Sequence, residues 1–194
     1  MFDLRHAGLA VPALLLSLAT VVAVGGCAAQ PPLPAVPQVD LQRFMGPWYV
    51  IANIPTFIEK DAHNAIESYQ LAADGSIATT FTFNAGSDTG SPKAYHPNGR
   101  VVPGTGNAVW GMQFVWPIRA EYRIFYLDSD YTRVIIARTA RDYLWIMART
   151  PQIPEEELQR LIGLAVAAGY DAAKVQRVPQ AAPRKPTDPA GPAK

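Results

Sequence analysis

The chain has 194 residues, of which 49% are hydrophobic and 17% are charged, and these proportions are typical of one soluble domain. Its formal net charge of +1 provides no strong field that would attract nucleic acid, and we expect no nucleic-acid partner. The single cysteine excludes an intrachain disulfide. The core must therefore be stable through apolar burial alone, which a domain of about 140 residues can achieve.

The N-terminal segment 1–26 has the layout of a secretory signal. Arg5 precedes an apolar stretch over 7–24. This stretch approaches the length of a transmembrane helix, so an uncleaved anchor is the competing interpretation. The end of the segment, Val24-Gly25-Gly26-Cys27, resembles the lipobox of bacterial lipoproteins. The resemblance implies that Cys27 carries acyl chains such as palmitate and becomes the mature N-terminus.

The residue after this cysteine is Ala28 rather than aspartate. In the bacterial lipoproteins that this segment resembles, such a residue favours sorting to the outer membrane over retention in the inner membrane. We therefore expect the mature protein to be anchored by its lipid in the outer membrane, facing the periplasm. Acyl chains on one residue add membrane affinity of about 0.8 kcal/mol for each buried CH₂ group.

Two segments of unusual composition flank the predicted domain. Residues 27–37 are rich in proline and predict an extended, semi-rigid tether. Residues 181–194 have no apolar period and predict a disordered tail. The folded domain is therefore expected over 38–180.

Strand-like segments follow one another at short intervals within this domain. Tight turns are indicated at Ala73-Asp74-Gly75 and Pro97-Asn98-Gly99. The pattern predicts an eight-stranded antiparallel up-and-down barrel, an all-β fold. A two-sheet sandwich is the alternative. The expected strands span residues 48–54, 65–71, 76–84, 92–96, 107–116, 121–127, 131–137 and 143–149.

One helix is expected after the strands. Pro154 is followed by three glutamates, which suit a helix N-terminus, and Gly169 is the expected C-terminal stop. Apolar residues between them form one stripe, so the helix should pack on the outside of the barrel. A short final strand is expected over 175–178. The stripe consists of Leu158, Leu161, Ile162, Ala165 and Val166.

A tryptophan in the first strand and an arginine in the last should seal one end of the barrel. Gly46 allows the backbone to turn tightly before Trp48, and a guanidinium is the usual partner of an indole face. Arg149 closes the last strand about a hundred residues later. We therefore expect these two side chains to stack on each other.

Alternation along the strands predicts which side chains face the interior. The predicted inward set is large and aromatic, and it fits either a filled core or a cavity that binds a ligand. Several members are tyrosines, whose hydroxyls need partners when buried. The set consists of Val50, Ala52, Trp110, Met112, Phe114, Trp116, Tyr122, Ile124, Tyr126, Tyr143, Trp145 and Met147.

Three motifs in this order resemble the lipocalin family. Gly46-Pro47-Trp48-Tyr49 is similar to the GxW signature that opens the first lipocalin strand. Asp130-Tyr131 is similar to the second motif, and the segment 141–151 resembles the last strand with its arginine, Arg149. Together with the lipobox, the match is most similar to bacterial outer-membrane lipoproteins of the Blc type. The segment 85–106 departs from the family pattern.

The resemblance implies a barrel that binds a fatty acid or a lysophospholipid and serves lipid transport, storage or envelope maintenance. It implies no cofactor, and a homodimer stays open. The alternative is an envelope interaction protein with a filled barrel that docks a partner through its loops.

The residues themselves offer little for catalysis, so we expect no enzyme. His63 and His96 lie in loop or edge regions without a nucleophile beside them, and no spacing suggests a metal site. Asp88-Thr89-Gly90 resembles an aspartic-protease triplet, but that chemistry needs two carboxylates that share a proton. Some lipocalins are isomerases through a barrel cysteine, and this predicted barrel contains none.

Overall fold

The computed structural model describes residues 32–115 and 117–181, and these form one antiparallel sheet with three short or medium helices. The strands are β1 (Gly46–Ile54), β2 (Ala62–Leu71), β3 (Ile77–Ala85), β4 (Ser91–Tyr95), β5 (Asn98–Val101), β6 (Val109–Val115), β7 (Ile118–Leu127), β8 (Arg133–Ala137), β9 (Leu144–Ala148) and β10 (Gln176–Arg177). The helices are α1 (Leu41–Phe44), α2 (Glu155–Ala167) and the 3₁₀-helix η1 (Ala172–Lys174).

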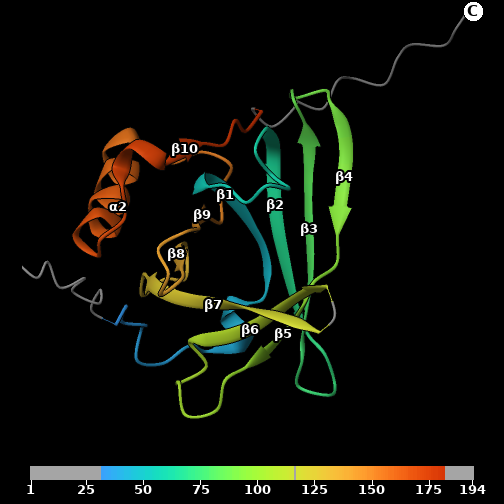
Figure 1. Cartoon of the computed structure of the whole chain (residues 1–194), viewed down its shortest axis with the longest axis vertical. Helices are drawn as coiled ribbons and strands as arrows, with labels where there is room; N and C mark the ends of the chain where they lie inside the picture. The colour runs from blue at the N-terminus through green and yellow to red at the C-terminus, as the bar shows by residue number, and fades with distance from the viewer. Residues whose placement is uncertain (1–31, 116, 182–194) are drawn as a thin grey trace, which may run out of the picture. The chain divides into compact units, whose positions relative to one another are not determined.

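The sheet closes on itself. Each strand pairs with its neighbour in the order β1-β2-β3-β5-β6-β7-β8-β9, and β9 returns to pair with β1. β4 and β5 both pair with β3, one above the other, and together they occupy one place in the wall. The structure is thus a closed eight-stranded antiparallel barrel, which confirms the predicted fold (Figure 1).

The helix predicted after the barrel is present as α2 and lies outside the strands (Figure 1). It buries Leu158, Leu161 and Ala165 against the outer face of β8 and β9, whereas Val166 from the predicted stripe is 43% exposed. Gly169 follows the helix with a φ of +96°, and the amide N–H of Tyr170 bonds to the carbonyl of Ala165. The predicted glycine stop is therefore confirmed.

Several local details differ from the sequence prediction. Asn98 and Gly99, expected in a turn, belong to β5 and extend the wall below β4. β8 begins at Arg133, so Tyr131 lies in the preceding turn rather than in the strand. Helix α1 was not predicted, although Asp40 caps it by accepting hydrogen bonds from the backbone of the first turn.

The expected tether is packed against the barrel in its last part. Leu33 is 2% exposed in the cluster between barrel and helix, and the amide N–H of Val36 donates to the carbonyl of Ile124 at 2.9 Å. The ordered unit thus begins before residue 38. At the other end, the side chain of Gln180 donates to the carbonyls of Val50 and Ala65, which fixes the chain after β10.

The pairing register shifts at four places in the described barrel, in β1, β2, β6 and β7, and two of these β-bulges affect predicted inward residues. The pairing register shifts between Val50 and Ala52 in β1, and between Ile124 and Tyr126 in β7. Because one extra residue is accommodated at each bulge, the alternation of inward and outward side chains is inverted beyond it.

Candidate functional site

One end of the barrel is sealed by Arg149. Its guanidinium carbon lies 3.8 Å from the centre of the Trp48 ring, which confirms the predicted stacking. Its Nη2 donates to the carbonyls of Arg43, Phe44 and Met45, each at 2.9 Å, and its Nη1 donates to the carbonyl of Pro47 at 2.8 Å. Partial burial lowers the pKa of Arg149 to about 10, so the group is still a cation at neutral pH. Arg149 thereby joins the last strand to the first strand and to α1.

The other two signature residues fit closely around this contact. A Cβ atom at Gly46, whose φ is +93°, would lie 3.4 Å from Nη1 of Arg149. Tyr131 also has a positive φ, of 59°, and its hydroxyl accepts the amide N–H of Asp40 at 2.9 Å. The guanidinium of Arg43 lies over the Tyr131 ring at 4.1 Å. These residues hold α1 under the barrel.

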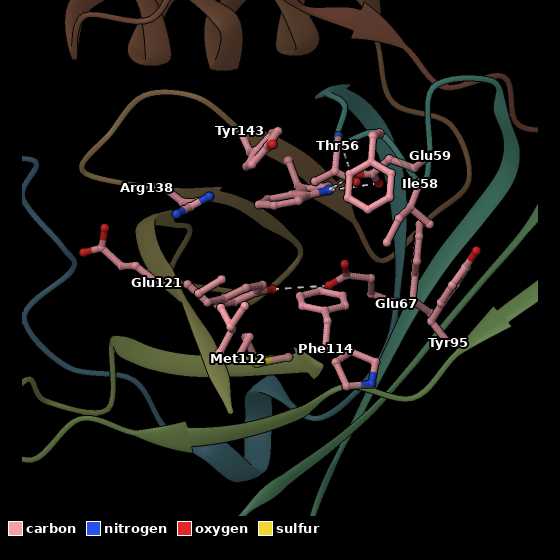
Figure 2. A pocket seen from close by; sticks show the side chains of 17 residues that line it. Thr56, Ile58, Glu59, Glu67, Tyr95, Met112, Phe114, Glu121, Arg138 and Tyr143 are labelled. Carbon is pink, nitrogen blue, oxygen red and sulfur yellow. Dashed lines mark hydrogen bonds between the residues drawn. The ribbon is translucent and has the colours of Figure 1, made fainter. Parts of the chain in front are cut away.

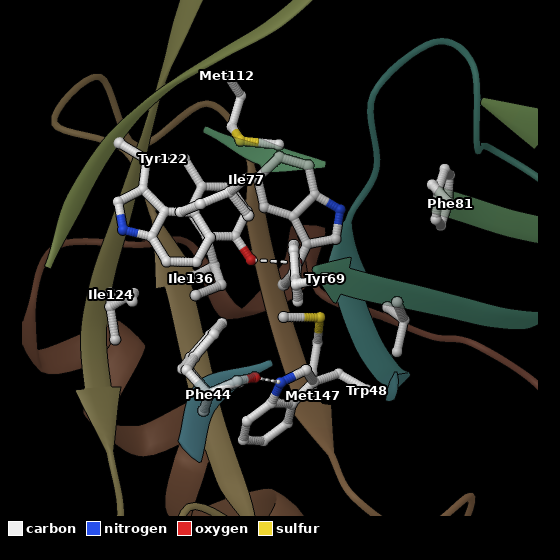
Figure 3. Close-up of a cluster of buried hydrophobic side chains, with 14 of the residues drawn as sticks. Phe44, Trp48, Tyr69, Ile77, Phe81, Met112, Tyr122, Ile124, Ile136 and Met147 are labelled. Carbon is white, nitrogen blue, oxygen red and sulfur yellow. Dashed lines mark hydrogen bonds between the residues drawn. The ribbon is translucent and has the colours of Figure 1, made fainter. Parts of the chain in front are cut away.

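The half of the barrel above this seal is filled with aromatic side chains (Figure 3). The ring of Phe44 lies 5.1 Å from that of Trp48, 5.6 Å from that of Tyr69 and 5.3 Å from that of Trp110. Trp110 in turn stacks on Tyr122 at 5.1 Å. The expectation of a filled core is therefore correct for this half.

The opposite half contains a cavity of about 250 Å³ (Figure 2). Its walls come from β2, β3, β4, β6, β7 and β9 and from the connections next to β1, β4 and β8, and they are mostly apolar. The volume lies just below the range of about 300–1,000 Å³ that is usual for small-molecule sites. The lining residues are Thr56, Phe57, Ile58, Glu59, Glu67, Phe81, Tyr95, Pro97, Met112, Phe114, Ile118, Ala120, Glu121, Tyr122, Arg138, Tyr143 and Trp145.

The predicted ligand-binding residues divide into three groups. Five of them line the cavity: Met112, Phe114, Tyr122, Tyr143 and Trp145. Four others, Val50, Trp110, Ile124 and Met147, face the barrel interior but belong to the packed cluster rather than to the cavity lining. Trp116, which was grouped with the inward residues, lies outside the described residues.

The third group, Ala52 and Tyr126, lies on the outer face of the barrel wall, so the prediction that these side chains point inward was wrong. Ala52 packs in the cluster beneath α2, and Tyr126 packs against the same cluster. The hydroxyl of Tyr126 accepts a hydrogen bond from Nη2 of Arg160 on the helix at 3.0 Å. The physical reason is the bulge before each of these residues, which inverts the alternation.

The connection between β1 and β2 folds over the cavity and is fixed there by Glu59. This side chain is 4% exposed and accepts hydrogen bonds from Nε1 of Trp145, at 3.2 and 3.1 Å, and from the amide N–H of Thr56, at 3.1 Å. Burial raises the pKa of Glu59 above its usual value. Sequence analysis missed this residue, because nothing in the pattern of a loop shows that one of its charged side chains turns inward.

A second buried carboxyl, Glu67, lies at the border between the cavity and the filled half. It is 7% exposed, and its Oε2 accepts hydrogen bonds from the hydroxyls of Tyr69 and Tyr122. Burial, with the nearby charge of Glu59, raises the pKa of Glu67 to about 8. Burial and the charge of Glu67 also raise the pKa of Tyr122. Glu67 could have been found from the sequence, because alternation in 65–71 puts it on the same face as Ala65 and Tyr69.

The mouth of the cavity carries large apolar side chains in contact with solvent. Phe57 is 80% exposed, Ile118 is 71% exposed and Phe114 is 47% exposed. All three line the cavity, and they come from the β1–β2 connection and from the facing strands β6 and β7.

Residues 39–180 match the lipocalin-like domain family over most of the described barrel. The chain belongs to the lipocalin family. This lipocalin is 32% identical to temperature-induced lipocalin-1 of Arabidopsis thaliana over 76% of this chain and 83% of that protein. It is 26% identical to the outer membrane lipoprotein Blc of Escherichia coli K12 over 84% of this chain and 93% of that protein, and it is a lipocalin of the Blc type.

Solved structures agree with the fold of the lipocalin. Insecticyanin from the tobacco hornworm Manduca sexta superposes with a TM-score of 0.60, at 15% identity, over 76% of this chain and 84% of that one. Lipocalins are generally binding proteins for small hydrophobic ligands rather than enzymes, and the cavity is the candidate site for such a ligand.

The predicted lipidation site, Cys27, and the signal segment 1–26 lie outside the described residues. Within 32–115 and 117–181, no helix is both long enough and apolar enough to span a membrane.

Proposed function

We propose that this lipocalin binds a fatty acid or a lysophospholipid in its cavity and acts in lipid transport, storage or envelope maintenance, without catalysis. The observation that carries the proposal is the half-empty barrel. The cavity of about 250 Å³ has mostly apolar walls, and it lies above a packed aromatic floor that closes the other end. A site of this kind accepts a hydrocarbon chain that enters from the open end.

The energetics suit a single-chain lipid. Burial of ten methylene groups contributes about 8 kcal/mol at roughly 0.8 kcal/mol per group. Association costs at least about 4 kcal/mol of this. The remainder, at most about 4 kcal/mol, corresponds to a dissociation constant of about 1 mM or weaker at about 1.4 kcal/mol for each factor of ten, so a longer chain or head-group contacts are needed for tighter binding.

The mouth supports an amphiphile that is only partly enclosed. The exposed side chains of Phe57, Phe114 and Ile118 would cover the part of the chain that leaves the cavity. Arg138 lines the same cavity, and its Nε is buried and has no hydrogen-bond partner among the described residues. This guanidinium is a candidate partner for a carboxylate or a phosphate at the outer end of the ligand.

A cavity-filling variant tests the proposal. Ala120 lines the cavity, so Ala120→Phe should place a ring in it and weaken decanoate or lysolipid binding at least tenfold. Ala94 is exposed on β4, and Ala94→Phe is the matched control with the same change on the outer surface. Binding is followed through the fluorescence of Trp145, which lines the cavity. Equal affinities of the two folded variants would exclude the cavity as the binding site.

Docking of a protein partner through the loops is the second candidate, because the exposed apolar rim would also suit a protein contact. The two candidates differ in their response to the variants. A docking role predicts that Phe57→Ser abolishes partner binding while Ala120→Phe has no effect on it. A lipid role predicts that both changes weaken binding of the same lipid.

We further propose that lipid-modified Cys27 holds the protein at the outer membrane, facing the periplasm. The relatives named outer membrane lipoprotein Blc and the segment 24–27 support this. The wild-type protein should incorporate labelled palmitate and fractionate with outer membranes, whereas Cys27→Ala should do neither. Palmitate labelling of the Cys27→Ala variant would contradict the assignment of the anchor.

A further inference from the structure

Glu67 presents one carboxyl oxygen, Oε1, that is free to hydrogen-bond with a ligand in the cavity. The side chain is 7% exposed and belongs to the cavity lining. Both tyrosine hydroxyls that reach it, those of Tyr69 and Tyr122, contact the same atom, Oε2. No described residue donates a hydrogen bond to Oε1. This oxygen is therefore available to a hydrogen-bonding group of a ligand.

Glu67 also marks the inner end of the cavity. Tyr69, two residues further along β2, does not line the cavity but packs on Phe44 and Trp110 in the filled half. Figure 2 shows that Glu67 points into the cavity from its wall, on the same side as Glu59. A ligand that enters from the mouth therefore meets Glu67 with its leading end.

The inner end of the cavity offers no cation to an anionic ligand group. The ionisable side chains that line the cavity are Glu59, Glu67, Tyr95, Glu121, Tyr122, Arg138 and Tyr143, with Tyr69 behind Glu67. Arg138 is the single basic member of this described set, and it lies on the opposite side of the cavity from Glu67 (Figure 2). Its Nη1 is 3.0 Å from the carboxylate of Asp142. A ligand carboxylate at the inner end would thus be buried without a cation beside it, which is costly for an ionised group.

We propose that Glu67 is a specificity-determining residue that binds a hydrogen-bond-donating, non-anionic end group, an alcohol or a protonated amine, at the inner end of the cavity. The hydrocarbon chain then runs outward past Trp145 to the apolar rim. This inference rests on the proposed function, that the cavity binds a single-chain amphiphile, and it narrows the class of that ligand. A free fatty acid is disfavoured in this orientation and has to bind with its carboxylate outward, near Arg138.

Alcohols and protonated amines should differ in the pH dependence of their binding, because they prefer different protonation states of Glu67. Burial and Glu59 raise the pKa of Glu67 to about 8, so an alcohol meets a neutral carboxyl at pH 7. A protonated amine favours the carboxylate, so its binding should release a proton from Glu67. The affinity for an amine should consequently rise between pH 6 and pH 9, whereas that for an alcohol should not.

The test uses three ligands with the same ten-carbon chain: decanol, decylamine and decanoate. They are titrated into the wild-type protein at pH 7 by calorimetry in two buffers of different ionisation enthalpy. The difference in binding enthalpy between the two buffers gives the number of protons released on binding. We expect decanol and decylamine to bind at least tenfold more tightly than decanoate. Glu67→Gln should retain decanol binding, lose about tenfold in decylamine affinity and abolish proton release. Glu156→Gln, an exposed change on α2, is the matched control and should behave as the wild type.

The outcomes separate this inference from the proposed function. If the three ligands bind the wild type equally well, or decanoate binds best, the cavity still binds lipids but the role of Glu67 is refuted. The same holds if Glu67→Gln leaves the ranking and the proton release unchanged. If no ligand binds the wild type, the proposed function fails and this inference fails with it. The wild-type ranking decides the matter even if a variant does not fold.

Discussion

Removal of the buried carboxyl of Glu67 should make the stability of the folded protein much less dependent on pH. In the unfolded chain this carboxyl has a pKa of 4.5, whereas in the barrel burial and the charge of Glu59 raise its pKa to about 8. Between these values the unfolded chain ionises while the folded protein keeps the proton. The free energy of unfolding of the wild type must therefore fall as the pH rises from about 4.5 to about 8.

The size of this loss follows from the two pKa values. Each pH unit between them costs about 1.4 kcal/mol, so the full interval corresponds to at most about 5 kcal/mol. Below pH 4.5 both states are protonated and the stabilisation is complete, and above pH 8 both are ionised and the loss is complete. The raised pKa of Glu59 has the same sign and adds to the trend. We expect Glu67→Gln to match the wild type near pH 5 and to be about 2–5 kcal/mol more stable at pH 8.

Urea unfolding followed by tryptophan fluorescence at pH 5, 6, 7 and 8 measures this difference. Glu156→Gln is the control, because this glutamate is exposed on α2 and should leave the wild-type curve unchanged. Parallel pH profiles for the wild type and Glu67→Gln would refute the argument. A variant that is less stable than the wild type at pH 8 would refute it as well, since it would mean that the ionised carboxylate stabilises the fold.

Three further predictions concern the seal, the loop and the bulges. Arg149→Lys keeps the charge but loses the planar stack and most carbonyl contacts, so urea unfolding should show a loss of about 2–4 kcal/mol, and an unchanged midpoint would contradict the seal. Trp145→Phe removes the indole N–H that donates to Glu59 and fixes the 55–61 loop. Trypsin should therefore cut this loop after the exposed Lys60 several times faster than in the wild type. Tyr126→Phe should leave lipid affinity unchanged because this residue lies outside the barrel, whereas Tyr122→Phe should alter it; equal effects in a titration would contradict the placement.

The closed barrel and its seal could be predicted from the sequence because their signals are local. Turn residues separate the strands at short intervals, and Trp48 and Arg149 mark the first and last of them. The interior was predicted correctly wherever alternation runs unbroken, as from Tyr143 to Met147, with Trp145 on the inner face. Helix α2 could be predicted from the glutamates in its first turn, its apolar stripe and the glycine that follows it, Gly169.

The errors at Ala52 and Tyr126 have one physical cause. A bulge adds one residue to one strand, and nothing in the amino-acid sequence indicates where it occurs. Side chains beyond the bulge point to the opposite face from the one that strict alternation predicts. Glu59 is a different case, because its burial depends on a donor from β9, which is more than eighty residues away. Glu67 lies between Ala65 and Tyr69 on the buried face of β2, so alternation along this strand predicts its inward position.

The wall of the barrel explains why one half is filled and the other is hollow. At the sealed end the ladders are continuous, since β5 pairs with both β3 and β6. Above it β4 pairs with β3, and no described strand pairs with its other edge. The wall is therefore free to spread between β4 and the tip of β6 and β7, where Phe114 and Ile118 are exposed. A mouth that can widen above a floor fixed by Arg149 would admit the proposed ligands at different chain lengths, so we expect selectivity to come from the inner end, where Glu67 lies.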